Sequence, residues 1–154
     1  LLRLNGGFGY NMTFSDLFLN SNYKIYQEKI VPLFSAYKNI YVVANFRAKL
    51  SGFLSQATHV PIPDNFFLTY NKTILSVMIE LGKIENGSLV LASASSLSNI
   101  IAYKLFLKRR DITVIDVGTS INFLLSLDHN IRNYHDNSKN YFFNKRQKGF
   151  NIRW

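Results

Sequence analysis

Two short polar segments in the second half of the chain carry the side chains best suited to holding a phosphate-bearing ligand. The first is the serine turn, Ser93-Ala94-Ser95-Ser96, which follows the apolar run Leu89–Ala92. Small residues let a phosphate approach the backbone N–H groups at the start of a helix, and the hydroxyls of Ser93, Ser95 and Ser96 add donors. In a plainer interpretation, Ser95 or Ser96 only caps the helix that follows.

The second segment runs from Asp116 to Ser120 and follows the apolar run 112–115. The Asp116 carboxylate can accept hydrogen bonds from ribose or sugar hydroxyls or bind a divalent ion, and Gly118, Thr119 and Ser120 would contact the same ligand. The alternative is that Asp116 caps the next helix together with Thr119 or Ser120.

Both segments belong to one predicted strand–helix–strand unit. Apolar residues recur at helical spacing from Leu97 to Leu105, and an apolar run of strand length lies on each side of this stretch. The unit therefore predicts two parallel strands joined by a right-handed helical crossover. Its two polar segments then lie at the carboxyl ends of parallel strands, where open α/β sheets bind their ligands.

The alternation of strand and helix extends along the chain. Apolar runs over residues 1–4 and 39–44 predict further strands, separated by helical patterns. Residues 59–63 predict a short strand that leaves the sheet, because Pro61 and Pro63 cannot continue a hydrogen-bonded ladder. We expect an α/β domain over residues 1–128, Rossmann-like, with a mostly parallel sheet of about five to six strands and helices on both faces. We expect residues 129–154 to form a basic, aromatic C-terminal arm that packs on this domain or extends from it.

Three finer expectations concern the helices. Residues 45–47 begin a helix after the 39–44 strand, and Asp64 or Asn65 caps the helix after the 59–63 strand. The buried side of the helix before Glu85 is expected to consist of Ile74, Leu75, Met78, Ile79 and Leu81.

The excess of basic over acidic residues indicates which kinds of binding partner the protein favours. Lys and Arg number 18 against 9 Asp and Glu, so the net charge is +9 and anionic partners are favoured. An Asn- and Lys-rich composition of genomic origin explains part of the same excess. The chain has no Cys, which excludes disulfide and thiolate metal sites, and His59, His129 and His135 lack zinc-site spacing.

The arm supplies a hypothesis of another class. Cationic and aromatic residues alternate over residues 129–154, a pattern that suits binding of nucleic acid or an anionic surface by a non-catalytic module. Alternatively, the aromatic side chains pack back on the sheet and the charges stay hydrated. A third hypothesis is a sugar-phosphate-binding or isomerase-like domain that uses the serine turn.

Residues 89–118 resemble the late strand–helix–strand segment of bacterial GT-D fold glycosyltransferases. Ala102-Tyr103-Lys104-Leu105 and Ile115-Asp116-Val117-Gly118 match the helix and strand-end patterns of that family, and Arg132-Asn133-Tyr134 is similar to its Arg-x-Tyr element. The family also has an early strand that ends in Arg-hydrophobic-Gly-Asp-Gly-Glu. Here Arg3-Leu4-Asn5-Gly6-Gly7-Phe8 occupies that place, and Gly6 and Phe8 stand where the two carboxylates would be.

The resemblance implies transfer of a sugar from a UDP-type donor to a glycan or glycoprotein acceptor during surface-polysaccharide assembly. It implies that Arg3, Arg132 and the serine turn stabilise the diphosphate and that Asp116 positions the sugar or ribose. Asn5, Gly6, Gly7 and Tyr134 would be further substrate contacts. Because the family's Mn²⁺- or Mg²⁺-binding carboxylates are missing, weak turnover or binding alone is implied. A cytoplasmic location is expected, either free or peripheral at the inner membrane, where a partner protein is a further candidate contact.

Overall fold

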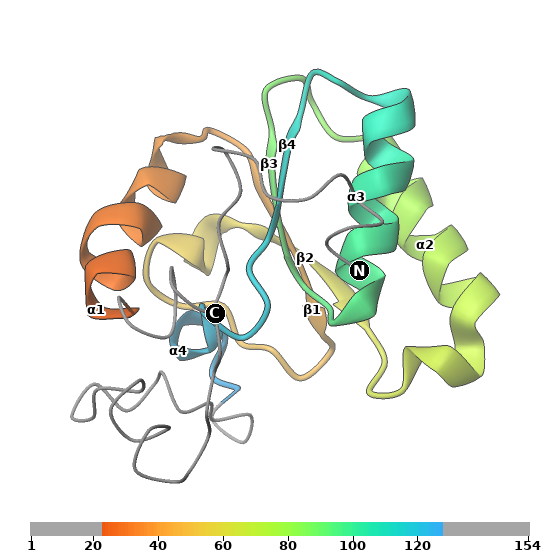
Figure 1. The fold of residues 1–154 in the computed structure, drawn as a ribbon, viewed down its shortest axis with the longest axis horizontal. Coiled ribbons are helices and arrows are strands. Elements are labelled where there is room, and N and C mark those ends of the chain that lie inside the picture. The colour runs from red at the N-terminus through yellow and green to blue at the C-terminus, as the bar shows by residue number, and fades with distance from the viewer. Residues whose placement is uncertain (1–22, 128–154) are drawn as a thin grey trace, which may run out of the picture. The chain divides into compact units, whose positions relative to one another are not determined.

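Figure 1 shows the computed structural model, which describes residues 23–127 of the 154-residue chain. These residues belong to two units, 23–30 and 31–127. The first contains α1 (Tyr23–Ile25) followed by the π-helical turn η2 (Tyr26–Ile30), and the rings of Tyr23 and Tyr26 stack with centroids 6.2 Å apart. The second contains the sheet and the elements that position the candidate site.

Four parallel strands form the described sheet. They are β1 (Ile40–Asn45), β2 (Thr58–Ile62), β3 (Leu89–Ser93) and β4 (Thr113–Asp116), in the spatial order β2-β1-β3-β4. The predicted α/β class and parallel sheet are confirmed, but the described strands number four rather than five to six. The prediction that the strand near residues 59–63 leaves the sheet was wrong, because β2 pairs with β1 along its whole length. The strand expected over residues 1–4 and the arm over residues 129–154 lie outside the described residues, so the predicted boundary at residue 128 stays a prediction.

β3 is the most deeply buried strand. Its residues from Leu89 to Ala92 have no exposed surface, as expected for a strand that is covered on both faces. It pairs with β1 from Ile40↔Leu89 to Ala44↔Ser93 and with β4 from Leu89↔Thr113 to Ala92↔Asp116. The uncharged run of the sequence therefore marks the centre of the sheet.

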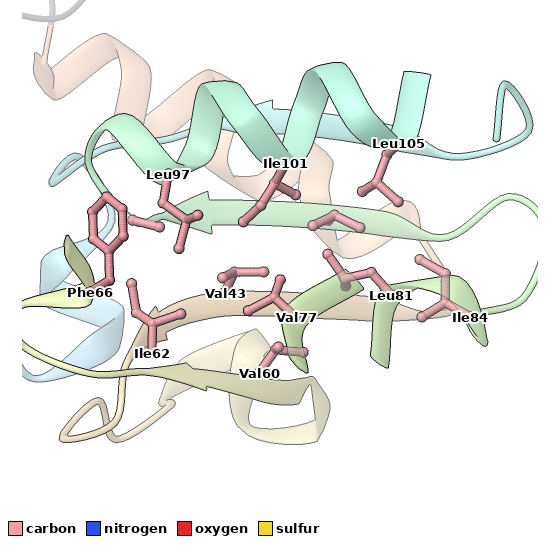
Figure 2. Packing of buried hydrophobic residues seen from close by; sticks show 12 residues of the cluster. Val43, Val60, Ile62, Phe66, Val77, Leu81, Ile84, Leu97, Ile101 and Leu105 are labelled. Atoms are coloured by element: carbon pink, nitrogen blue, oxygen red, sulfur yellow. The ribbon is translucent and has the colours of Figure 1, made fainter. Parts of the chain in front are cut away.

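One face of the sheet is covered by two long helices, α2 (Tyr70–Gly82) and α3 (Ser96–Lys108), with the short η5 (Phe66–Thr69) before α2. Figure 2 shows Leu97, Ile101 and Leu105 of α3 pointing toward the strands beside Val77 and Leu81 of α2. The cluster comprises Val43, Val60, Ile62, Phe66, Val77, Leu81, Ile84, Val90, Ala94, Leu97, Ile101 and Leu105. None of the helices within residues 23–127 combines the length and apolar character needed to cross a membrane.

The opposite face is covered by shorter elements, η3 (Val31–Ala36), η4 (Gly52–Gln56) and α4 (Asn122–Leu125), as Figure 1 shows. The helix expected from residue 45 was wrong. The chain instead runs alongside α4, where the amides of Lys49 and Ser51 donate to the carbonyls of Leu125 and Leu124 at 2.9 Å. Gly52 then adopts φ +57°, a left-handed conformation that a continuing helix excludes.

The predicted buried side of α2 was partly wrong. Thr73, Val77 and Leu81 face the core, whereas Leu75 and Ile79 are 62% and 47% exposed. A polar residue can occupy the buried stripe because the Thr73 hydroxyl is hydrogen-bonded to the Thr69 hydroxyl at 3.0 Å. The helix is therefore rotated from its expected orientation, and two large apolar side chains face outward.

A partly buried ion pair fastens the C-terminal end of α3 to the loop after α2. The Arg109 guanidinium donates to both oxygens of Asp111, at 2.7 to 3.2 Å, and also to the carbonyl oxygens of Gly82 and Ile84. These hydrogen bonds from Arg109 hold the pKa of Asp111 below its ordinary value, although burial acts in the opposite direction. The deprotonated form of Asp111 is therefore favoured in the folded state.

We expect Asp111→Asn to lower the stability of the protein at neutral pH and to lower it less in acid. Because the folded-state pKa of Asp111 is depressed, its contribution is complete above the unfolded-state pKa of about 4 and is lost as pH falls through the folded-state value. Urea unfolding from neutral pH to acid pH measures the difference. Arg109→Gln should remove the same pH dependence, whereas Arg110→Gln should leave it unchanged.

A pair of matched isoleucine variants tests the packing of the two helices. Ile101 has no exposed surface and Ile79 is 47% exposed, so Ile101→Ala should lower the free energy of unfolding by roughly 2–5 kcal/mol. Ile79→Ala should change it by about 0.5 kcal/mol or less. Chemical denaturation measures both, and equal losses would contradict the packing.

Candidate functional site

The carboxyl ends of the strands form the edge on which the predicted site residues converge. The chain passes from β1 to β2 on one side and then returns across β1 to β3 on the other. This reversal places a topological switch point between β1 and β3, the position at which open α/β sheets bind ligands. The loop after β1, residues 46–51, and the serine turn after β3 begin on either side of that point, because Ala44 pairs with Ser93.

Ser98 holds the serine turn in place. It has no exposed surface, its hydroxyl oxygen accepts from the Ala94 amide at 3.2 Å, and its hydroxyl donates to the Ala92 carbonyl oxygen at 3.4 Å. The Leu97 amide donates to the Ala94 carbonyl oxygen at 3.1 Å. The amides of Ser95 and Ser96 donate no hydrogen bond within the described part of the chain, so both can donate to a ligand.

Ser95 has a strained backbone. Its φ of 53° and ψ of −140° lie close to a region that only glycine adopts without strain. Although Ser95 occupies the N-cap position of α3, its side chain makes no capping hydrogen bond, so capping by Ser95 does not account for the turn. This strain could not be predicted from the residue types, because the turn lacks the glycines that usually accompany such a conformation.

This strained strand-to-helix turn resembles the turns that expose nucleophilic serines in hydrolases. Such a serine needs a base, and His59 is the one histidine among the described residues. Its Nε2 atom lies 3.3 Å from the Ala44 carbonyl oxygen. No hydrogen bond joins His59 to Ser95 among those of the described residues, so the pairing of a nucleophilic serine with a base is not formed here.

Asp116 lies on the strand next to the serine turn, directly opposite Ala92. Its Oδ1 atom accepts a hydrogen bond from the Gly118 amide at 3.1 Å, and Gly118 has φ +49°. The N-cap of α4 is Ile121, so the alternative in which Asp116 caps this helix with Thr119 or Ser120 was wrong. The carboxylate closes its own turn through one oxygen, and its exposed position leaves the second oxygen accessible.

The remaining residues of the Asp116 turn are less exposed. Ser120 is buried and its hydroxyl donates to the Val117 carbonyl oxygen at 2.6 Å, while Thr119 is half-buried. The Val117 amide donates to the Ala92 carbonyl oxygen at 3.0 Å and so extends the pairing of β3 and β4. Ser120 therefore supports the turn, and Gly118 and Asp116 lie nearer the accessible edge.

Sequence reasoning missed a polar cluster at the ends of β1 and β2. The Asn45 side-chain amide donates to Asp64 Oδ1 at 2.8 Å, and Asn45 Oδ1 accepts from the Arg47 amide at 3.0 Å. The Arg47 guanidinium forms an ion pair with Asp64, and both side chains are half-exposed. Asp64 therefore orients Arg47 and does not cap a helix, and Asn65 makes no capping hydrogen bond either.

A signal for this cluster was present in the sequence. Asn45 and Asp64 each come at or just after the end of an apolar run, and the ends of adjacent parallel strands meet. The register pairs Asn45 with Ile62, two residues before Asp64. Arg47 is thus held just past the carboxyl end of β1, where its guanidinium contacts Asp64 after β2.

Comparison with protein-family models, with curated proteins and with solved structures found no match.

Several predicted site residues lie outside the described residues, and their roles stay predictions. They are Arg3, Asn5, Gly6, Gly7, Arg132 and Tyr134. The nucleic-acid hypothesis also concerns residues outside this range, the arm over residues 129–154.

The metal that the resemblance implies finds no set of ligands among the described residues. Within residues 23–127, no three His, Cys, Asp or Glu side chains lie close enough together to hold an ion. Asp64 is engaged with Arg47 and Asn45, and Asp116 lies in a turn of its own. The donor set at the described edge does not fit a divalent cation.

We expect Ser95→Gly to stabilise the protein, because glycine adopts the conformation of Ser95 without strain. Relief of strain should exceed the entropic cost of glycine and raise the free energy of unfolding by about 1 kcal/mol. Urea unfolding measures the change. Ser96→Gly is the matched control and should be destabilising, since Ser96 has an ordinary helical position at the start of α3.

Proposed function

We propose that this domain binds a sugar nucleotide at the carboxyl edge of its sheet and acts in glycosyl transfer to a glycan or glycoprotein acceptor. The observation that carries the proposal is the switch point between β1 and β3, because Arg47 follows β1 and the serine turn follows β3 at this edge of the sheet. The specific ligand class comes from the resemblance of residues 89–118 to GT-D fold glycosyltransferases.

The diphosphate of such a ligand suits the charges at this edge. The amides of Ser95 and Ser96 lie at the N-terminal end of a 13-residue helix, where the helix dipole favours negative charge. Arg47 has five N–H donors, and its pairing with Asp64 leaves part of the guanidinium for a phosphate. The hydroxyls of Ser95 and Ser96 are exposed and provide further donors.

The sugar or ribose would lie toward β4. The exposed carboxylate of Asp116 keeps one oxygen for the Gly118 amide, and its other oxygen can accept hydrogen bonds from two neighbouring hydroxyls. Ala92 pairs with Asp116, so the carboxylate is one strand away from the serine turn. A ligand that spans phosphate and sugar groups would bridge these two strand ends.

In transfer, negative charge develops on the departing diphosphate as the bond to the sugar breaks. Donors that are already oriented toward this charge lower the barrier because they need no reorganisation. Arg47 is oriented by Asp64, and the Ser95 amide is oriented by the turn that Ser98 holds. These groups would stabilise the negative charge of the departing diphosphate.

Titration calorimetry tests the proposed ligand directly. The full chain should bind UDP and UDP-sugars, and Mn²⁺ should change the affinity little, because the described edge lacks a cluster of metal ligands. No binding at about 1 mM of any nucleotide would contradict the proposal. Preference for a hexose phosphate over UDP would favour the sugar-phosphate hypothesis instead.

We expect Arg47→Gln to weaken UDP binding by about tenfold, because a charged hydrogen bond to a phosphate is lost. The matched control is Arg110→Gln, which removes the same charge from an exposed side chain stacked on Phe106. Calorimetry of both variants measures the change. Equal affinities of the two variants for UDP would show that Arg47 does not contact the ligand.

A further inference from the structure

The helical layer carries exposed apolar side chains that the sugar-nucleotide site does not use. On α2 these are Leu75 and Ile79, and on α3 they are Tyr103, Phe106 and Leu107, which are 64%, 57% and 61% exposed. Figure 2 shows the other side of α3 pointing into the core. The outer helical surface is defined here by the side chains Leu75, Ile79, Tyr103, Phe106, Leu107, Lys72, Lys104, Lys108 and Arg110.

The outer helical surface is more apolar than the exposed side of a helix normally is. Helix α3 has apolar residues on all its sides, a distribution typical of helices that are covered all round. Single exposed apolar side chains are ordinary, but several of them on two adjacent helices mark an interaction surface. The outer helical surface is therefore expected to contact another molecule or a membrane.

The charges of this surface are predominantly basic. Lys72, Lys104 and Lys108 are exposed, and none of them has an ion-pair partner among the described residues. Helices α2 and α3 contain one acidic residue, Glu80, which pairs with Lys83 at 3.6 Å. The surface is therefore complementary to a negatively charged body.

A shallow groove separates the two helices. Its volume is about 290 Å³, and its lining includes the apolar Ile74, Leu75 and Met78 beside Lys104 and Lys108. The most exposed apolar side chains of α3, Tyr103 and Leu107, are not among the residues that line it. They project from α3 outside this hollow, so the exposed apolar residues extend beyond what a partner helix bound in the groove would cover.

We propose that the outer helical surface docks on an anionic lipid bilayer. The projecting aromatic and aliphatic side chains would enter the interfacial region, and Lys104 and Lys108 would contact lipid phosphates at the groove. The contact cores of protein partners are depleted in lysine, which favours a bilayer over a protein. A second copy of the chain would bring the same lysines against each other and be repelled.

Flotation with lipid vesicles tests this proposal on the full chain. The protein should float with vesicles of phosphatidylcholine mixed with phosphatidylglycerol, should not float with phosphatidylcholine alone, and should be released by salt. Lys104→Gln with Lys108→Gln should lower the partition coefficient about thirtyfold, since each lysine near an anionic surface accounts for about fivefold.

The matched control keeps the net charge of that double variant. Lys38→Gln with Lys49→Gln removes two exposed lysines outside the outer helical surface and should lower partition much less. Equal losses for the two double variants would overturn the proposal, because they would reflect net charge alone. Undiminished binding of the Lys104 and Lys108 variant would also overturn it.

A fluorescent label reports insertion independently of affinity. The chain has no Cys, so Tyr103→Cys gives a single attachment point for an environment-sensitive dye. Its emission should shift to the blue with anionic vesicles, whereas the same dye at Leu33→Cys, equally exposed on η3, should not shift. The proposal would be overturned if the emission of the dye at residue 103 did not shift with anionic vesicles. It would also be overturned if the emission shifted without lipid, because self-association or residues outside the described range would then cover this surface.

Discussion

The fold depends on the burial of β3 from both sides. A strand without exposed surface from Leu89 to Ala92 needs a cover on each face of the sheet and a hydrogen-bonded strand at each edge. Parallel pairing in turn requires crossovers long enough to return the chain to the same end, which α2 and α3 provide. One consequence is functional: every polar residue that follows a strand is placed at the same edge.

The same constraint explains why much of the fold could be predicted from the sequence. Uncharged runs at 39–44 and 89–92 predict buried strands, and both strands are present close to these positions. The orientation of α2 was harder to predict, because apolar residues occupy most of its positions and the periodicity does not single out one side. Its buried stripe includes Thr73, whose hydroxyl is hydrogen-bonded to the hydroxyl of Thr69. The sequence pattern does not reveal this hydrogen bond.

The candidate site was predictable in its location and less so in its members. The serine turn and Asp116 follow strands, so their placement at one edge follows from strand order alone. Arg47 follows β1 in the same way, but its position depends on a contact with Asp64, 17 residues away, that only the register of β1 and β2 creates. Similarly, the conformation of the serine turn depends on the buried Ser98, whose hydroxyl is hydrogen-bonded to the Ala94 amide and the Ala92 carbonyl.

The strand β2, at the edge of the described sheet, pairs with β1 and also positions part of the candidate site. Pro61 and Pro63 keep it short, since proline cannot continue a hydrogen-bonded ladder in a central strand. Because β2 ends at Ile62, the chain can turn and place Asp64 against Asn45 and Arg47. The carboxylate lowers the freedom of the guanidinium and also neutralises part of its charge. A phosphate that binds there meets an arginine that is already oriented, so the loss of side-chain entropy on binding is smaller than for a free arginine.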